Sequence, residues 1–303
     1  MRGLKLRRFI ARATPRVIRK RTPKFISKHL YFKGFFKVRL NTERTLSLYS
    51  EGYILENEIY WYGIAGGHEK KSVNLWIEYI NHFQPKVIFD VGANTGIYGL
   101  VAQAVSQDSK VTYFEPIPKA TSILRMNLDA NSFEGTIHQV ALSNYDGKGI
   151  FNISEKDDFA YSITLNTYAD LAILGVHDET QKYREMEVAV RQISTMIEQN
   201  EIMPPDLMKL DVETSEYDVL LGLGKYFENV GAFLVEVLNS ELADKLNKLF
   251  NPANYAFYNV DDMANLITKT ENIQSTKNYN YFIIKKNLTA DFISLKQEFM
   301  GAK

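Results

Sequence analysis

The strongest constraint on the fold is a regular alternation of short apolar runs with longer amphipathic runs from residue 86 onward. The apolar runs are typical of buried strands, and the first five are 87–91, 110–115, 136–141, 207–212 and 232–237. Two later runs of the same kind are 255–260 and 280–284. Runs with helical spacing separate them, at 99–105, 120–130, 215–223 and 242–250. Because parallel strands need long crossovers, usually helical, this alternation predicts an α/β fold with a mostly parallel twisted sheet and helices on both faces.

The regions around this pattern define the predicted domain organisation. Residues 86–303 form the main domain, and a stretch of about 149–205 departs from its rhythm, so we expect an insertion there. This insertion either contributes to acceptor binding or is a structural excursion only. Residues 43–85 are expected to hold a small β element and a helix that Pro85 terminates. The β element rests on two short runs, 45–49 and 59–62.

Charge is distributed unevenly along the chain. The net charge is zero, but fourteen of the 36 Lys and Arg residues lie in residues 1–42, and the first acid is Glu43. The remaining residues therefore carry 22 basic and 36 acidic side chains. A cationic leader on an acidic body points to a polyanionic partner, either an anionic membrane surface or a nucleic acid.

The basic leader, residues 1–42, has several interpretations. Its apolar residues are interleaved with cations, which suits a peripheral amphipathic segment on anionic lipid. The same composition resembles a mitochondrial transit peptide, and a solvated tail or a grip on nucleic acid also fits. The chain has no run of roughly 18 apolar residues that could span a bilayer. We expect a cytoplasmic protein, free or peripheral at a membrane, with mitochondrial targeting left open.

Cysteine and histidine usage narrows the possible chemistry. The chain has no cysteine, which rules out disulfides, thiolate nucleophiles and thiolate zinc sites, and fits a reducing compartment. The five histidines form no H-x-x-x-H or H-E-x-x-H pair, so we expect no histidine-based metal site. A divalent cation held by carboxylates stays open.

The first strand leads into the most informative motif. The strand 87–91 carries Asp90, and a tight loop with Gly92 and Gly96 precedes the next helix. Gly92 is expected to let the backbone pass close to a ligand, and Gly96 to let the helix start in close packing. The dinucleotide fingerprint and the P-loop are both absent. A ligand with ammonium and sulfonium groups needs carboxylates rather than bare amides, and Asp90 fits that requirement.

Two further strands end in residues that suit a nucleoside. Glu115 ends the second strand, where an acid can accept hydrogen bonds from a ribose diol. The third strand runs into Ala141, Leu142 and Ser143, which could sandwich an adenine and bind its edge. Three such features in order on successive strands predict a site for S-adenosylmethionine (SAM).

From about His68 to Val237 the chain resembles the FkbM family of SAM-dependent methyltransferases. The motifs that carry the resemblance begin at Glu69, Asp90, Phe114, Asn127, Ala141, Lys209 and Val235. The resemblance implies a Rossmann-like SAM-methyltransferase fold, and it adds Glu69 and Asn94 to the cofactor-binding residues. It also implies O-methylation of a hydroxyl on a sugar, glycan or natural product. Thr214-Ser215 departs from the family's usual Gly-Ala, and Ser194-Thr195-Met196 stands where a Leu-Asp pair is common.

The carboxylates that follow the middle strands are the candidate catalytic groups. A hydroxyl acceptor benefits from a base, and ligands bind at the carboxyl ends of the strands in open α/β sheets. Asp211, Glu213 and Glu236 lie there. Residues two apart in a strand face the same way, so Asp211 and Glu213 are expected to share one crevice and to raise one pKa. Alternatively, Glu213 caps the next helix and Asp211 only orders a loop.

Two other functions stay open at this stage. A nucleic-acid methyltransferase could use the leader as its grip, although no Asn-Pro-Pro-aromatic motif follows the fourth strand. A non-catalytic, membrane-associated binding protein could keep the fold without turnover, and Thr214-Ser215 is the only feature that favours it.

Overall fold

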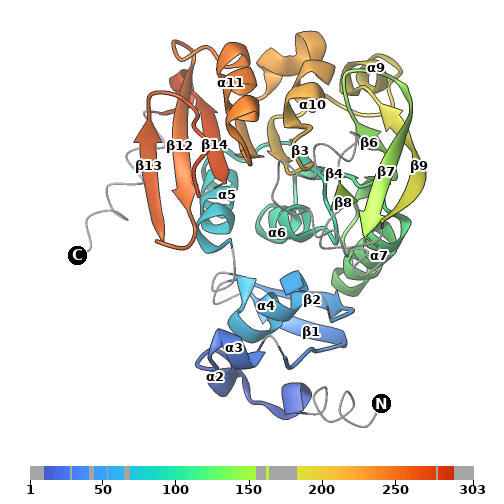
Figure 1. Ribbon diagram of the computed structural model, residues 1–303, viewed down its shortest axis with the longest axis vertical. Coiled ribbons are helices and arrows are strands. Elements are labelled where there is room, and N and C mark those ends of the chain that lie inside the picture. Colours follow the sequence, from blue (N-terminus) through green and yellow to red (C-terminus); the bar gives the residue numbers. More distant parts are fainter. Residues whose placement is uncertain are drawn as a thin grey trace.

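An eight-stranded sheet forms the centre of the main domain in the computed structural model (Figure 1). The structure describes residues 10–27, 29–40, 44–52, 54–64, 69–154, 162–163, 183–277 and 279–289. In spatial order, the strands are β13 (Leu266–Thr270), β12 (Tyr255–Asp261), β14 (Asn280–Lys285), β11 (Ala232–Glu236), β10 (Leu207–Leu210), β3 (Val87–Val91), β4 (Lys110–Phe114) and β5 (Thr136–His138).

The strand order creates a switch point between β3 and β10. From β3 the chain moves outward through β4 to β5, then returns to the other side of β3 and continues through β10 to β11. These five strands are parallel, whereas β14 is antiparallel to both of its neighbours, β11 and β12. The predicted α/β, Rossmann-like fold is thus confirmed, and it places the expected ligand crevice where the order reverses.

Both faces of the sheet are buried under helices. Alternate strand residues belong to two separate apolar clusters, because successive side chains point to opposite faces. On one face Ile88 and Leu234 pack with α5 (Lys70–Phe83), α6 (Ile97–Val105) and α7 (Pro118–Asn131). On the other face Phe89 and Phe233 pack with α9 (Ile193–Glu198), α10 (Glu216–Gly222) and α11 (Ser240–Leu249). This double burial explains why the strands read as continuous apolar runs.

The predicted third strand and insertion take a different form in the structure. One strand over 136–141 is wrong: β5 ends at His138, and β6 (Ala141–Leu142) leaves for a second sheet. That sheet has the order β6-β9-β7-β8, with β7 (Gly147–Ser154), β8 (Ser162–Ile163) and β9 (Tyr183–Arg191). Residues 155–161 and 164–182 of the predicted insertion lie outside the described residues.

An N-terminal unit lies below the main domain in Figure 1. Its elements are α2 (Arg16–Arg19), α3 (Lys24–Ser27), β1 (Gly34–Arg39), β2 (Thr45–Ser50) and α4 (Ile54–Tyr62). The sequence pattern ends the leader at residue 42, yet β1 within the leader pairs with β2, which follows it. The expected β run at 59–62 is wrong, because these residues are helical in α4; a four-residue apolar run fits either state. No helix among the described residues is long and apolar enough to span a membrane.

Two asparagines of α7 fix the N-terminal unit to the main domain. The side-chain oxygen of Asn127 accepts a hydrogen bond from Tyr49 N (2.7 Å), and its amide donates to Thr95 O (2.9 Å). Asn131 binds Ser47 in the same way, accepting from its N–H (2.8 Å) and donating to its carbonyl (2.7 Å). Asn127 is fully buried, so these bonds form away from water and also hold the loop after β3.

We predict that Asn127→Ala lowers the free energy of unfolding by about 2–4 kcal/mol, because it leaves buried backbone groups without partners. Urea denaturation measures this change. The matched control is Asn144→Ala, since Asn144 is exposed and its amide donates to Asp218 (3.1 Å) at the surface; it should stay within about 0.5 kcal/mol of the parent. Equal losses in the two variants would contradict the bridging role of Asn127.

Candidate functional site

A cleft opens at the carboxyl ends of β3, β4 and β10, at the switch point of the sheet. It encloses about 960 Å³ of empty space, part of which is open to solvent. Eight of the twelve site residues expected from the sequence line it: Glu69, Gly92, Asn94, Glu115, Ala141, Leu142, Asp211 and Glu213. The other four, Asp90, Gly96, Ser143 and Glu236, are not among the lining residues.

The two loop glycines are required for different reasons. Gly92 has φ +69°, and a Cβ there would lie 1.8 Å from the carbonyl oxygen of Asp211. The close approach expected at Gly92 is therefore to the segment after β10, a neighbour that the sequence pattern did not indicate. Gly96 has φ +89°, and its Cβ would meet Leu124 of α7 at 2.2 Å. Gly96 thus allows the close helix packing that the sequence predicts.

Asp90 lies behind the cleft rather than in its wall. Its Oδ2 accepts a hydrogen bond from Gly99 N (2.8 Å), which fixes the start of α6. Its Oδ1 is buried and has no hydrogen-bond partner. Burial raises the pKa of Asp90 to about 6, against the opposing effect of Lys209. A nearby positive charge would lower this raised pKa and favour the ionised carboxylate.

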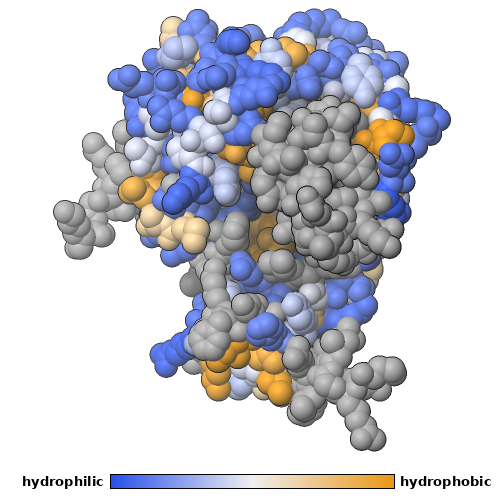
Figure 2. Space-filling view, viewed as in Figure 1, coloured by the Kyte–Doolittle hydropathy of each residue, from blue (hydrophilic) through white to orange (hydrophobic). Residues whose placement is uncertain are grey.

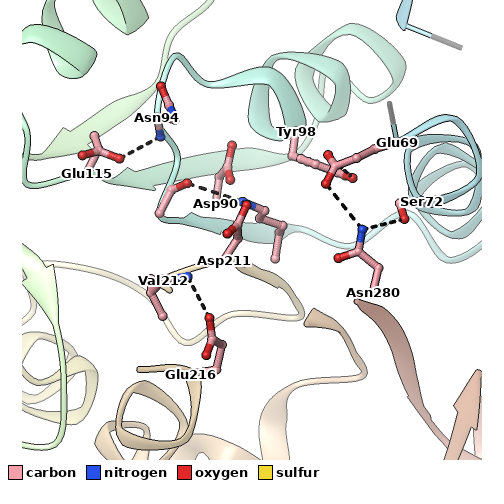
Figure 3. Close-up of polar contacts among 12 residues, drawn as sticks. Glu69, Ser72, Asp90, Asn94, Tyr98, Glu115, Asp211, Val212, Glu216 and Asn280 are labelled. Atoms are coloured by element: carbon pink, nitrogen blue, oxygen red, sulfur yellow. Dashed lines mark hydrogen bonds and ion pairs between the residues drawn. The ribbon is translucent and has the colours of Figure 1, made fainter. Parts of the chain in front are cut away.

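Glu115 organises the loop after β3 and faces the cleft (Figure 3). Its carboxylate accepts hydrogen bonds from Asn94 N (2.8 Å) and Ile117 N (2.9 Å). Burial raises the pKa of Glu115 to about 7 despite these two bonds. A carboxylate can accept roughly four hydrogen bonds, so it keeps capacity for a diol.

The third-strand residues build an apolar wall. Ala141 and Leu142 line the cleft from β6, together with Phe114, Val140 and Phe151. Sequence reasoning missed Val140 and Phe151, because neither belongs to a strand-end motif. Ser143 is buried and donates its N–H to Arg191 O (3.0 Å), so its backbone closes the second sheet.

Lys209 is a site residue to which sequence reasoning gave no role. Its ammonium lies 2.9 Å from Asp211 Oδ2 and 3.4 Å from Gly92 O, and it faces the ring of Tyr98 at 5.4 Å. Burial works against its charged form, but the negative charges of Asp211 and Asp90 raise its pKa. The available signal was the two-residue spacing, which puts Lys209 and Asp211 on one side of the chain.

The three candidate catalytic carboxyl groups form a coupled set. Burial favours neutral Asp211, but the charge and hydrogen bond of Lys209 lower its pKa, so Asp211 is ionised. Burial and the adjacent Asp211 raise the pKa of Glu236 well above its usual range, and protonated Glu236 is hydrogen-bonded to Asp211. Burial, then repulsion from Asp211, raises the pKa of Glu213 to about 8. The environment thus favours the charged form of Asp211 and the neutral forms of Glu213 and Glu236.

Glu69 closes the other end of the cleft. Its carboxylate accepts from the Tyr98 hydroxyl (3.0 Å) and from the Asn280 amide (3.4 Å), as Figure 3 shows. Burial, then the charge of Asp211, raises the pKa of Glu69. Asn280 also donates to Ser72 Oγ (3.0 Å), and the side chain of Asp262 caps the backbone of α5 there. The last strands of the sheet therefore position Glu69.

The cleft is electrostatically suited to a cation. The carboxyl groups of Glu69, Glu115, Asp211 and Glu213 line it, whereas Lys209 is the one basic side chain among its described lining residues. Glu216 and Glu236 are hydrogen-bonded to the lining residues Val212 and Asp211. In the described part of the chain, no group of three or more His, Asp or Glu side chains is arranged to hold a metal ion.

We predict that Thr214→Gly raises the free energy of unfolding by about 1 kcal/mol. Thr214 has φ +77°, a conformation unfavourable for a β-branched residue, at the position where the family usually has glycine. Chemical denaturation provides the measurement. Ser215→Gly is the control, because Ser215 has φ −94°, and it should lower stability by about 0.5–1 kcal/mol. Equal destabilisation by both changes would argue against strain at Thr214.

We predict that Glu216→Gln flattens the pH dependence of stability. Glu216 is fully buried; one oxygen accepts from Val212 N (2.9 Å), the other has no partner, and burial raises its pKa to about 8. The folded chain thus holds a proton that the unfolded chain releases, so stability falls as pH rises from about 5 to about 8.

In Glu216→Gln this slope should decrease by up to about 1 kcal/mol per pH unit, measured by urea denaturation at several pH values. The exposed Glu271→Gln should leave the slope unchanged. A parental slope in Glu216→Gln would show that Glu216 is ionised in the folded protein.

Comparisons with known proteins agree with the geometry. The family profile described as "Methyltransferase FkbM domain" matches residues 90–272. The 31-O-demethyl-FK506 methyltransferase FkbM of Streptomyces tacrolimicus is 29% identical over 156 residues, 45% of this chain and 59% of that protein. Methyltransferase 1 of Beauveria bassiana (strain ARSEF 2860) is 26% identical over 169 residues, 51% of this chain and 65% of that protein. The matched region thus spans less than two thirds of either relative.

Solved structures that resemble the chain include an O-methyltransferase from Bacillus cereus in complex with SAH. It has 11% sequence identity and a TM-score of 0.39, covering 74% of this chain and 83% of that one. Precorrin-6y C5,15-methyltransferase from Geobacter metallireducens GS-15 has 10% identity and a TM-score of 0.39, covering 72% and 90%. Since the family profile spans more than half of the sequence, this chain belongs to the FkbM methyltransferase family.

Proposed function

We propose that this protein is a SAM-dependent methyltransferase that methylates a hydroxyl on a sugar, glycan or natural product. The observation that carries the proposal is the coupled carboxyl set of Asp211, Glu213 and Glu236 at the switch-point cleft. Lys209 lowers the pKa of Asp211, whereas burial raises the pKa of Glu213 to about 8, so the set offers a negative charge for a cation and a group that can take up a proton near neutral pH. The name of the Streptomyces relative, which refers to an oxygen of FK506, supports an oxygen acceptor.

The residues of the cleft fit SAM. Glu115 has free acceptor capacity for a ribose diol, and the apolar side chains of Phe114, Leu142 and Phe151 suit an adenine ring. The excess of carboxyl groups, with an unpartnered oxygen on Asp90, suits the ammonium and sulfonium charges. Bound there, SAM supplies a methyl carbon activated by the sulfonium.

Glu213 is the candidate base for the acceptor hydroxyl. It lines the cleft, and its pKa of about 8 lies close to neutral pH, where a general base combines availability with proton affinity. Asp211 is less suited to this role, because Lys209 keeps it ionised and lowers its affinity for a proton. The Asp211–Glu236 pair instead offers hydrogen bonds that orient the hydroxyl.

The test is methyl transfer from radiolabelled SAM by the full chain to a panel of oligosaccharides and hydroxylated natural products. We expect an O-methyl product, identified by mass spectrometry and NMR. Glu213→Gln should lower kcat by about 10²- to 10⁴-fold and leave the Kd for SAM within about threefold, because it removes proton transfer but little binding. The kcat of the parent enzyme should rise with pH below about 8, because the SAM cation lowers the pKa of Glu213 from that value, and this dependence should vanish in the variant.

The exposed Glu271→Gln is the matched control and should retain the parental kcat. Failure of the full chain to bind SAM in calorimetry would refute the cofactor assignment. Methylation of nitrogen or of nucleic acid would refute the acceptor class. If Glu213→Gln kept the parental kcat, Glu213 would be excluded as the base.

A further inference from the structure

The N-terminal unit exposes aliphatic side chains among cations. Ile10, Ile18 and Ile26 are 41%, 54% and 41% exposed. Exposed cations accompany them in the same segments: Arg12, Lys20 and Arg21. Figure 2 shows hydrophobic residues at the lower end of the molecule, where Figure 1 draws α2 and α3. We call these six residues the basic-isoleucine surface.

Contacts with α4 fix the segment that carries these isoleucines. Ala11 accepts a hydrogen bond from the Tyr60 hydroxyl (2.7 Å). The guanidinium of Arg19 covers the Tyr60 ring at 4.1 Å. Tyr62 bonds to Ser27 Oγ (2.6 Å). The exposed isoleucines therefore belong to a segment that is packed against α4.

Charge is equally one-sided. The sequence contains no acid before Glu43, and Glu51 of the N-terminal unit pairs with Lys33. The rest of the chain has 36 acids against 22 bases. An anionic plane would therefore attract this end and repel the body, which fixes one orientation.

We propose that the basic-isoleucine surface docks the protein on an anionic lipid bilayer. Cations bind the headgroups, and the isoleucines enter the boundary between headgroups and acyl chains, as on amphipathic membrane-binding surfaces. A nucleic acid would use the cations, but contacts with its phosphate backbone would bury no aliphatic side chain. The proposal is independent of the proposed methyl transfer.

The test is co-sedimentation of the full chain with vesicles of phosphatidylcholine alone or with about one third phosphatidylserine. We expect binding to the anionic vesicles only, and its loss at about 0.5 M salt. Lys20→Glu/Arg21→Glu should weaken binding by about tenfold or more through charge. Ile18→Ser/Ile26→Ser should weaken binding by a similar factor at unchanged charge, because it removes the apolar contact.

Matched controls lie elsewhere on the surface. Met263→Ser/Leu266→Ser removes two apolar side chains that are 88% and 54% exposed, and Lys110→Glu/Lys248→Glu reverses two exposed cations of the main domain. Both controls should bind vesicles like the parent. Parental vesicle binding by Ile18→Ser/Ile26→Ser, or equal binding to neutral vesicles, would overturn the proposal. So would RNA or DNA binding at physiological salt that is tighter than vesicle binding and insensitive to the isoleucine change.

Discussion

The buried Lys209, paired with the partly exposed Asp211, joins the two strands that meet at the switch point. The ammonium of Lys209 reaches both Asp211 and the Gly92 carbonyl, so it joins the ends of β10 and β3. Removing either partner would leave an uncompensated charge, which is strongly unfavourable. Burial and then the charge of Asp211 raise the pKa values of Glu213 and Glu236. The geometry and the acid–base properties of the cleft are therefore linked through Asp211.

The N-terminal unit completes this site. Asn127 bonds to β2 and to the backbone of Thr95, and the Thr95 hydroxyl donates to Glu56 of α4 (2.7 Å). Leu55, beside Glu56, lines the cleft itself. The loop after β3 is thus held from the sheet side by Glu115 and from the N-terminal side by α4. A surface that docks at this end would be coupled to the cleft through a short series of buried hydrogen bonds.

The sequence was most informative where burial on both faces leaves little choice. The strand at Val87–Val91 was predicted residue for residue, and β10 and β11 were found within two residues, because parallel strands between helices are continuously apolar. The prediction of one strand over 136–141 is wrong because the chain changes sheets in the two residues between His138 and Ala141. The pairing of β6 with β9 depends on residues far along the chain. The β run predicted at 59–62 is wrong because so short an apolar run has no period that distinguishes a strand from the helix α4. Lys209 stayed without a role since its partners lie on three different segments.

The same electrostatic interactions suggest how the cleft can hold so many acids. A fixed row of ionised carboxylates would repel itself and destabilise the fold. Protonated Glu213 avoids this repulsion, with Asp211 as the ionised member beside Lys209. A cation near Glu213 favours its ionised form and shifts its pKa downward. The residue proposed to accept the hydroxyl proton would therefore be readied for that role only when the cleft contains a positive charge, which ties proton acceptance to occupancy of the cofactor site.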